Sequence, residues 1–434
     1  MLARLSFRIA LATTALFGTG ASAQTLDPLQ IFVSKDTQTL VVYDGDQVVA
    51  TSHISTGKPG HTTPSGIFSI IEKSIMHNSN LYESAPMPFM QRITWDGVAL
   101  HESNSVPNYP ASHGCVRMPG KFARQLWDMT NRGFHVVITE RELTPHAMQT
   151  ADLFKPRYAR PDPQTMSDAD LRPTMSVDPG TEVAMNETLP KLGATAVATL
   201  PKDIDPVKIL ITRPSQQSRT IAVQQMLAQL GYDVGDADGY LGDQTRTAIK
   251  TYQAIHSQKQ TGTLTPKLVA SIYKVLRRQQ PTGWLYARRN FKPVFDAPVE
   301  ISEPNLALGT HFIEAVHVNM AQNSADWVGV TLDNYIPNKT AKRLGIVRYG
   351  DAQAPDAAEQ AFARVTIPDN VRARIETMLG NGSSITITDT GTESKTGDGT
   401  DFITVTRDTS YSDNSYQDNL GASNSDDEIG HYAN

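Results

Sequence analysis

From residue 27 onward the chain alternates apolar and polar residues in short runs, and this two-residue period is typical of β strands. The pair Asp44-Gly45 separates two such runs, and an Asp-Gly pair is a strong signal for a tight hairpin. Residues 119–132 instead repeat apolar positions at helical spacing, and Gly133 follows them as a helix stop. The pattern predicts that residues 27–140 form a mainly β domain with one or two helices.

Two changes of pattern divide the middle of the chain. Prolines recur through residues 141–207 without a periodic apolar face, which predicts an extended linker. Residues 208–280 then contain three helical segments, of which the first carries apolar residues at helical spacing from Val223 and ends at Gly231. We therefore expect a small three-helix domain after the linker.

The last part of the chain returns to strand-like patterns. Residues 283–408 alternate apolar and polar positions around one short helix, which predicts a C-terminal β-rich domain of the α+β type. Residues 409–434 are rich in Ser, Asp and Asn and are expected to be disordered. A length of 434 residues is too great for a single hydrophobic core and fits this multidomain arrangement.

The N-terminus has the layout of a secretory signal peptide. Arg4 and Arg8 form a basic start, an apolar run covers residues 9–17, and an Ala-Ser-Ala cleavage site ends at Ala23. The apolar run is about half of the ~20 residues that a membrane-spanning helix needs, which disfavours a membrane anchor or a buried helix. We expect residues 1–23 to be removed and the mature protein to reach the periplasm or cell envelope without a membrane span.

Charge and ligand spacing argue against two classes of function. The formal net charge is −6 and no basic stripe is present, so nucleic acid is not an expected partner. The chain has no His-Glu-x-x-His motif and only one cysteine, which does not fit a zinc site. A calcium loop around Asp238 would start at Val234 and end at Thr245, and neither residue is a carboxylate. No metal and no cofactor are expected.

The only cysteine of the chain, Cys115, lies in the stretch SHGCVRM. Exported proteins usually pair their cysteines in disulfides, and this thiol has no partner within the chain. A buried inert thiol is the alternative, since unpaired cysteines are often core residues. The neighbours His113, Gly114 and Arg117 do not typically surround a core cysteine, so Cys115 is a candidate nucleophile.

A nucleophilic thiol needs a base and a site that stabilises developing negative charge. His101 ends a strand-like run fourteen positions before Cys115, and a loop of that length can bring the two together. Backbone N–H groups around Gly114 can form an oxyanion hole for acyl transfer. Arg117 could bind a substrate carboxylate or pair with an acid of the protein, and the sequence leaves both open. These residues predict an exported cysteine enzyme of acyl transfer.

The stretch HESNSVPNYPASHGCVRM resembles the active-site signature of the L,D-transpeptidase catalytic domain, and STGKPGHTTPSGIFSI resembles an upstream part of the same family. The resemblance covers residues 28–140. It implies that Cys115 is the nucleophile and His101 the base. It also implies an oxyanion hole made of the backbone N–H groups of His113, Gly114 and Cys115.

Further implied roles concern the residues around this pair. By the resemblance, Ser112 and Arg117 shape the pocket and bind the substrate. The family often has Gly-Thr or Ser after the first histidine, whereas this chain has Glu102 followed by Ser103. In the family that next residue orients the imidazole through its backbone carbonyl, a contact that a change of side chain can leave intact. The carboxylate of Glu102 adds a negative charge beside the base.

The resemblance also implies a substrate and a reaction. The family's substrate is a peptidoglycan tetrapeptide stem, in which the thiolate attacks the L-centre carbonyl of the third residue. D-Ala leaves, and an amine of a second stem accepts the acyl group to form a cross-link. Transfer to water would instead make the protein an L,D-carboxypeptidase. A non-catalytic cell-wall-binding scaffold is the alternative from a different class of function.

The later domains bear on the same substrate. The stretch VQQMLAQLGYDVGDADGYLGDQTRTAIKTYQ resembles a peptidoglycan-binding domain of three helices, so peptidoglycan stem peptides and glycan are the expected partners. Residues 283–408 faintly resemble the first domain in their strand-turn-strand opening. The sequence leaves open whether they form a copy of the first domain without a cysteine or an unrelated β accessory domain.

Overall fold

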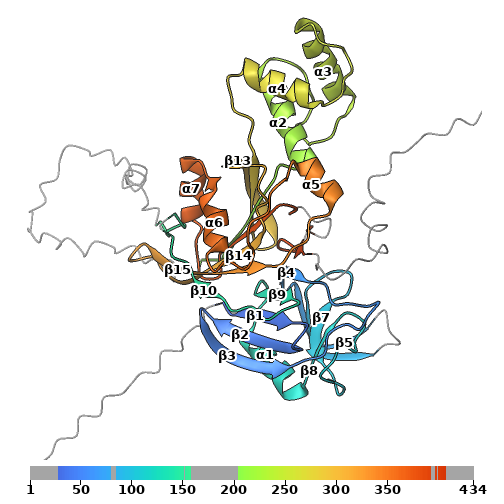
Figure 1. Ribbon diagram of the computed structural model, residues 1–434, viewed down its shortest axis with the longest axis vertical. Coiled ribbons are helices and arrows are strands. Elements are labelled where there is room, and N and C mark those ends of the chain that lie inside the picture. Colours follow the sequence, from blue (N-terminus) through green and yellow to red (C-terminus); the bar gives the residue numbers. More distant parts are fainter. Residues whose placement is uncertain are drawn as a thin grey trace, which may run out of the picture.

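The protein is described by a computed structural model, which covers residues 28–79, 85–150, 152–157, 204–391, 396–397 and 399–406. Two β domains are stacked on each other, and a helical unit stands at the far end of the second (Figure 1). The predicted signal peptide 1–23, most of the predicted linker and the predicted tail 409–434 lie outside the described residues. Within the described ranges, no helix has the length and apolar character needed to cross a membrane.

The first β domain consists of two sheets and one helix. Its elements are β1 (Gln30–Ser34), β2 (Thr39–Asp44), β3 (Gln47–His53), β4 (Gly66–Ser69), β5 (Glu72–Asn78), β6 (Pro86–Arg92), β7 (Ala99–Glu102), β8 (Val116–Met118), α1 (Gly120–Met129) and β9 (His135–Thr139). One sheet has the order β18-β4-β9-β1-β2-β3 and the other the order β5-β6-β7-β8. Phe122 and Leu126 of α1 pack into a core with Phe68 and Val136. The prediction of a mainly β domain with one or two helices is confirmed.

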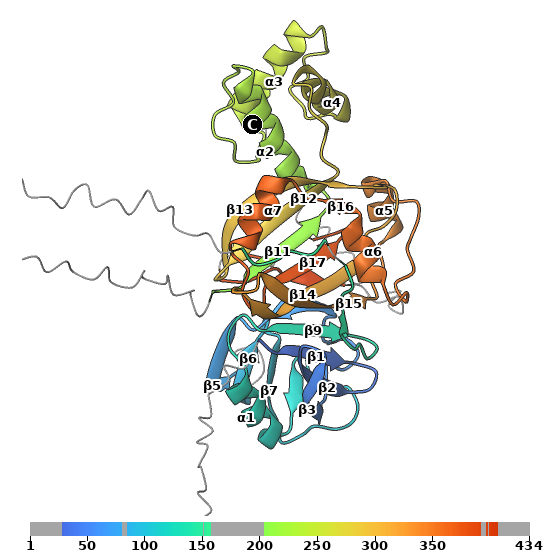
Figure 2. The same ribbon diagram turned by 90° about the vertical axis from the view of Figure 1, so that its left-hand side faces the viewer.

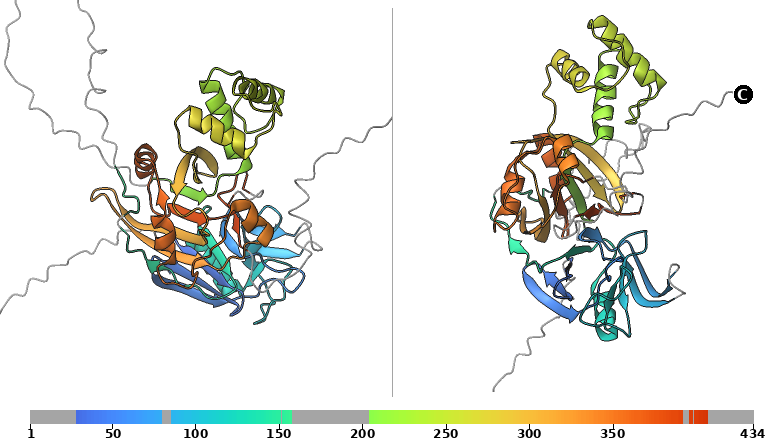
Figure 3. Two further views of the ribbon diagram at one scale, coloured as in Figure 1. Left: turned by 45° about the horizontal axis from the view of Figure 1, so that its top comes forward. Right: turned by 45° about the vertical axis from the view of Figure 1, so that its right-hand side comes forward.

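The helical unit has a separate hydrophobic core. Its helices are α2 (Gln216–Gln229), α3 (Asp243–Ile255) and α4 (Pro266–Val275). Val223, Ile249 and Tyr252 lie in its centre and are buried. Figure 3 shows the three helices standing off the sheets at one end of the molecule. The predicted three-helix unit is therefore confirmed.

The second β domain contains one large sheet with three helices beside it. Its elements are β10 (His146–Ala147), β11 (Val207–Thr212), β12 (Gly283–Arg289), β13 (Lys292–Ile301), β14 (Thr310–Asn319), β15 (Ser324–Leu332), α5 (Asn338–Leu344), α6 (Ala357–Ala363), β16 (Val365–Thr366), α7 (Asp369–Glu376) and β17 (Ser384–Thr388). The strand order is β10-β15-β14-β17-β11-β12-β13-β16. Figure 2 shows this sheet between the helical unit and the first domain.

Two boundaries in this region differ from those expected from the sequence. The predicted linker ends and the predicted helical domain begins at residues 207–208, yet this stretch begins strand β11, in the middle of the second sheet. All six of its residues are buried, including Lys208, which interrupts the apolar run that would mark a central strand. Phe154, in the predicted linker, is buried in the core of the second domain. The helical unit is therefore an insertion between β11 and β12.

The two β domains have the same strand topology. In the first, β1 pairs antiparallel with β2 and parallel with β9, which pairs antiparallel with β4. In the second, β11 pairs antiparallel with β12 and parallel with β17, which pairs antiparallel with β14. The hairpins β2–β3 and β12–β13 each have a register shift, after Val42 and after Ala287 respectively. Val42 pairs with Ile31 of β1 and Ala287 pairs with Ile209 of β11, so the two shifts occur at equivalent positions. A shared bulge of this kind indicates a shared fold rather than a chance likeness.

The segments that lead into the last strand of each domain also correspond. Residues 115–139 and 364–388 have equal length, and their alignment places β8 with β16, α1 with α7 and β9 with β17. In this alignment Arg364 stands at the position of Cys115. Of the two alternatives for the last domain, the structure therefore favours a copy of the first domain without a cysteine.

An apolar cluster joins the two copies face to face. The first domain contributes side chains from β1, β2, β4 and β9, including Phe32, Tyr43 and Ile67. The second contributes Phe312 from β14 and Leu332 from β15. Burial of this much aromatic and aliphatic surface holds the two sheets together, because each sheet would otherwise expose an apolar face to water.

A buried polar cluster crosses the same interface. Nζ of Lys208 donates to the carbonyl oxygen of Gly382 (2.6 Å) and lies 3.3 Å from Nδ1 of His135. That Nδ1 lies 3.3 Å from Oε1 of Glu314, while Nε2 of His135 lies 3.2 Å from Oγ of Ser384. Burial lowers the pKa values of both His135 and Lys208. Because His135 and Ser384 occupy equivalent positions in the two copies, their contact resembles one near the axis of a two-fold dimer.

The chain returns to the first domain after β17. Strand β18 (Thr404–Val405) pairs antiparallel with β4 at the edge of the first sheet. Gly66 of β4 has a φ of +153°, and a Cβ at this residue would lie 2.1 Å from the carbonyl oxygen of Thr404. Only glycine therefore allows the two strands to approach this closely.

We expect the Gly66→Ala substitution to lower the free energy of unfolding by about 2 kcal/mol or more, because the methyl group would displace β18 and the backbone would be strained. Gly60→Ala is the matched control, since Gly60 also has a positive φ but nothing within 4 Å of its Cβ position. Thermal midpoints of the two variants measure the difference. Equal midpoints would show that the contact between β4 and β18 does not limit stability.

Candidate active site

His101 lies in a strand of the smaller sheet, and Cys115 directly precedes the neighbouring strand. His101 is in β7, and β8 runs parallel to β7 with Arg117 directly opposite His101. Side chains alternate between the faces of a sheet, so Cys115, two residues before Arg117, is placed toward the same face. The charge of Arg117 also acts on the pKa of both His101 and Cys115, which places both groups near the same guanidinium. The structure thus brings the predicted base and the predicted nucleophile together.

A tight turn presents Cys115. Gly114 has a φ of +114°, a conformation that favours glycine. The hydroxyl of Ser112 donates to the carbonyl oxygen of Cys115 (2.5 Å) and accepts from the N–H of Gly114 (3.1 Å). The thiol of Cys115 donates to the carbonyl oxygen of Gly97 (3.5 Å). These contacts hold the thiol in one orientation at the start of β8.

The turn is tied to the loop that follows β3. The hydroxyl of Thr63 donates to the carbonyl oxygen of Gly114 (2.8 Å) and accepts from the N–H of Gly57 (2.9 Å). A Cβ at Gly57 would lie 1.9 Å from the carbonyl oxygen of His61 and 3.0 Å from Cα of Gly114. Thr63 is completely buried. Its hydroxyl therefore fixes the distance between this loop and the cysteine turn.

His101 is a buried and neutral imidazole. Its Nδ1 lies 2.7 Å from the carbonyl oxygen of Glu102. Because a carbonyl oxygen can only accept, Nδ1 carries the proton and Nε2 keeps a lone pair. Burial lowers the pKa of His101 to about 4, and the charge of Arg117 acts in the same direction. The ring can therefore accept a proton through Nε2 at neutral pH.

The thiol of Cys115 is protonated at rest. Burial raises its pKa above the ordinary value of a cysteine, while the charges of Arg117 and Arg92 act in the opposite direction. A neutral imidazole beside a neutral thiol differs from a preformed ion pair. The thiol therefore becomes a nucleophile only when its proton moves to a base during attack.

Glu102 serves the site through its backbone. Its carboxylate lies against Gly120, the first residue of α1, where a Cβ would be 2.9 Å from Oε1. A negative charge is stabilised near the N-terminal end of a helix. The carbonyl that orients His101 is retained, and the extra carboxylate is accommodated by a glycine at the start of α1.

Two of the predicted site residues form a hydrogen bond with each other inside the turn. The N–H of Gly114 donates to the hydroxyl of Ser112 (3.1 Å). Ser112 is only 1% exposed, and its hydroxyl both donates and accepts within the turn. Ser112 therefore shapes the turn that carries Cys115, and its role toward substrate stays a prediction. The sequence does not show that the hydroxyl of Ser112 is used within the turn, because a serine beside the candidate nucleophile has the same signature in either role.

The other two predicted residues lie at the surface of the site. His113 is exposed, and its ring packs edge-on against that of His61 with 4.8 Å between centroids. Arg117 is half-buried, and no carboxylate in the described part of the chain forms an ion pair with it. Its backbone N–H donates to the carbonyl oxygen of Ser55 (2.9 Å). The internal-acid alternative for Arg117 thus has no candidate among the described residues.

Two contributors to the site have no assigned role from the sequence. Thr63 lies in the stretch that resembles the family, but nothing in the sequence shows that its hydroxyl reaches Gly114. Strand β18 lies far along the chain, and its pairing with β4 has no sequence signal. Within the described ranges, no group of three or more His, Cys, Asp and Glu residues is arranged to hold a metal ion.

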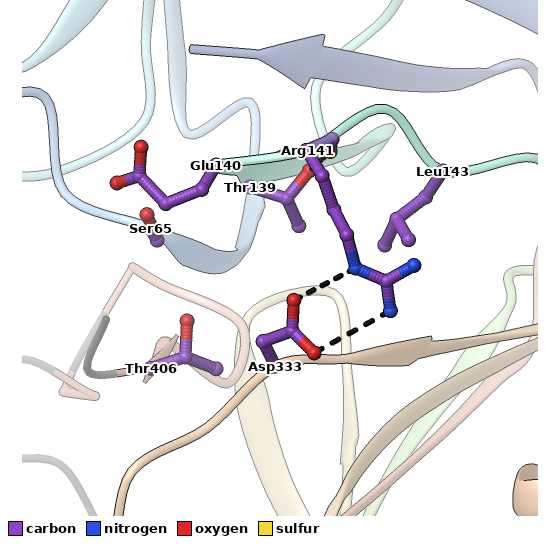
Figure 4. Close-up of a pocket in the computed structure, with 7 residues that line it drawn as sticks. All are labelled: Ser65, Thr139, Glu140, Arg141, Leu143, Asp333 and Thr406. Atoms are coloured by element: carbon purple, nitrogen blue, oxygen red, sulfur yellow. Dashed lines mark hydrogen bonds and ion pairs between the residues drawn. The ribbon is translucent and has the colours of Figure 1, made fainter. Parts of the chain in front are cut away.

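A cavity between the two copies lies apart from this site. It is lined by Ser65, Thr139, Glu140, Arg141, Leu143, Asp333 and Thr406. Figure 4 shows Arg141 and Asp333 facing each other there, with 2.7 Å between Nε and Oδ2. None of the predicted catalytic residues lines it.

Two parts of the chain match models of known protein families. Residues 28–138 match the family model of the L,D-transpeptidase catalytic domain, and residues 216–272 match that of a peptidoglycan binding domain. No curated protein matches the chain.

Solved structures similar to the chain include three L,D-transpeptidases. One is from Mycobacterium smegmatis (23% identity, 26% of this chain and 59% of that chain, TM-score 0.25). Another is from Xylanimonas cellulosilytica (30% identity, covering 26% of this chain and 62% of that chain, TM-score 0.24). A third was solved in complex with imipenem (26% identity, covering 26% of this chain and 59% of that chain, TM-score 0.24). The chain spans about six tenths of the length of these proteins.

The family match spans both His101 and Cys115, from β1 to near the end of β9. Residues 28–138 are thus similar to L,D-transpeptidase catalytic domains, and residues 216–272 are similar to a peptidoglycan binding domain.

Proposed function

We propose that the protein is an L,D-transpeptidase that forms peptidoglycan cross-links through an acyl-enzyme on Cys115. The observation that carries this proposal is the placement of a neutral His101 in β7 and of the thiol of Cys115 directly before β8, the parallel neighbour of β7. The family match of residues 28–138 supports the same chemistry.

The reaction begins with proton transfer. Nε2 of His101 takes the thiol proton as the sulfur attacks the L-centre carbonyl of the third stem residue. The carbonyl oxygen becomes an oxyanion, which accepts hydrogen bonds from the backbone N–H groups of Cys115 and His113. The intermediate then breaks the bond to D-Ala, and the departing amine takes the proton from His101. A thioester between Cys115 and the stem remains.

Transfer completes the cycle. An amine of a second stem attacks the thioester and loses its proton to Nε2 of His101. The sulfur leaves as thiolate and recovers that proton, which restores both groups. Water in place of the amine gives an L,D-carboxypeptidase, the alternative within the same chemistry.

Arg117 is proposed to bind a carboxylate of the stem peptide. It is half-buried beside His101 and Cys115, and no ion pair within the described residues satisfies its guanidinium. A guanidinium can bind a carboxylate through two parallel hydrogen bonds, which would orient the stem as well as attract it.

The remaining chain is proposed to keep the enzyme at its substrate. The peptidoglycan binding domain implies peptidoglycan as a partner, and this unit stands clear of the two β domains (Figure 3). The signal-peptide pattern of residues 1–23 supports export to the periplasm or cell envelope, where peptidoglycan lies. A scaffold without catalysis is the alternative, and it would leave Cys115 and His101 without a role.

Product analysis tests the function. Incubation of the protein with purified disaccharide-tetrapeptide is expected to give cross-linked dimers that have lost one D-Ala, detected by mass spectrometry. Tripeptide alone would indicate the carboxypeptidase, and unchanged substrate would indicate the scaffold. Cys115→Ala is the control: we expect no product, with an unchanged circular dichroism spectrum. Turnover by this variant would exclude the proposed nucleophile.

The two histidines are expected to differ in effect. His101→Gln should slow acylation of Cys115 by imipenem by about 10²–10⁴-fold, the usual contribution of a general base. His113→Gln should remain within about threefold of the unsubstituted protein, because its backbone N–H persists. A β-lactam suits this test because its strained carbonyl reacts with a thiolate. Intact-mass spectrometry follows the mass gain, and the reverse ranking would contradict the assigned roles.

The pH dependence follows from the pKa of His101. Because that pKa is about 4, the imidazole stays neutral and competent as a base well below pH 6. We expect the rate of imipenem acylation to fall by less than about twofold from pH 7 to pH 5.5, whereas an ordinary imidazole would lose nearly tenfold. A loss of that size in single-turnover measurements would show that His101 is not held in the neutral form.

A further inference from the structure

A segment of the second copy reaches the catalytic domain. Residues 399–406, here called the C-terminal strap, follow β17 and cross from the second copy to the first. Nε of Arg288 in β12 donates to the carbonyl oxygen of Thr400 (3.2 Å), and its guanidinium lies 5.7 Å from the ring centre of Phe402. Arg288 is buried, so the second copy holds this end of the strap firmly.

The other end of the strap is built into the first domain. Strand β18 pairs with β4, and the N–H of Thr406 donates to the carbonyl oxygen of Ser65 (2.9 Å). Ile403 is 1% exposed and belongs to the core of the first domain. Figure 4 shows Ser65 and Thr406 on adjoining segments beside the cavity between the copies. The first domain is therefore incomplete without residues from the far end of the chain.

One path leads from the strap to the cysteine turn through residues 63–65, directly before β4. Ser65, which accepts from Thr406, is two residues from Thr63, and both are buried. The hydroxyl of Thr63 donates to the carbonyl oxygen of Gly114, next to Cys115. A shift of this segment would therefore be passed to the turn by a single hydrogen bond.

A second path leads through the turn before β7. A methyl group placed on Gly399 would lie 3.7 Å from Cζ2 of Trp95, so the strap runs beside this side chain. The N–H of Gly97 donates to the carbonyl oxygen of Thr94 (3.3 Å), which closes the turn that contains Trp95. The carbonyl oxygen of Gly97 accepts from the thiol of Cys115 (3.5 Å). The strap thus borders the segment that contacts Gly114 and the turn that contacts the thiol of Cys115.

We infer that the C-terminal strap positions the cysteine turn for acylation, with the backbone N–H of Thr406 as its main anchor on the catalytic domain. The inference rests on the proposed function, because acylation is the step that needs this alignment. Thr406 is a positioning residue, which acts through Ser65 and Thr63. The cysteine-free copy then has a role in catalysis although it has no nucleophile.

A pair of substitutions in the full-length protein separates the anchor from its side chain. Thr406→Pro removes the N–H that Ser65 accepts, and a proline remains compatible with an extended edge strand. Thr406→Ala keeps the N–H and is the matched control. Two quantities are measured for each: the rate of imipenem acylation, and the pH midpoint for alkylation of Cys115 by iodoacetamide.

Both quantities are expected to change in Thr406→Pro alone. Misalignment of the turn should slow acylation by about tenfold or more, as small displacements at a reacting centre do. Burial raises the pKa of Cys115, so a loosened turn should move the alkylation midpoint down toward about 8.5, the value of a free cysteine. If a folded Thr406→Pro matches Thr406→Ala in either quantity, the inference is overturned.

Two further comparisons keep the outcome clear. If circular dichroism shows that Thr406→Pro is unfolded, Arg288→Met takes its place, because it releases the strap at the second copy and leaves β18 intact. If the unsubstituted protein gains no imipenem mass, the proposed function fails. The alkylation midpoint, which needs only a titrating thiol, then decides by itself whether the strap acts on Cys115.

Discussion

The catalytic arrangement depends on the parallel pairing of β7 with β8. This ladder places His101 opposite Arg117 and brings the residue before β8, Cys115, toward the same side. Neither strand is long enough to be stable alone, so the arrangement relies on what surrounds it: the core that contains Leu100 and Val116, and the hydrogen bond from Thr63 to Gly114. The geometry of the nucleophile is thus a property of the whole first domain.

Burial gives the two catalytic groups complementary neutral forms. It lowers the pKa of His101 and raises that of Cys115, so neither carries a charge before substrate binds. Such a pair avoids the cost of a buried ion pair and makes the thiol less prone to oxidation than a free thiolate. Proton transfer then accompanies attack, which confines the reactive thiolate to the time when a carbonyl is in place.

The second copy has no cysteine, and its contacts with the first domain are structural. Arg364 stands at the position of Cys115, and its guanidinium donates to the carbonyl oxygens of Leu306 and Ala307 (both 2.8 Å). The second copy therefore has an arginine bound to backbone carbonyls where the first has its thiol. The second copy retains a sheet that buries the apolar face of the first domain. It also contains the point at which the helical unit is inserted, and it leads into the strap whose strand β18 pairs with β4. This combination resembles a dimer fused into one chain.

The sequence by itself determined the local elements and the three-helix unit, and it indicated a candidate nucleophile and a candidate base, because strand periodicity, helix stops and a lone cysteine beside histidines are local signals. It did not determine that Ser112 turns inward or that the N–H of Gly114 is used within the turn, since both depend on backbone angles. It also did not show that β11 belongs to the second sheet or that β18 completes the first. Pairing partners so far apart in sequence are selected by the packing of whole sheets, and only the tertiary structure decides that.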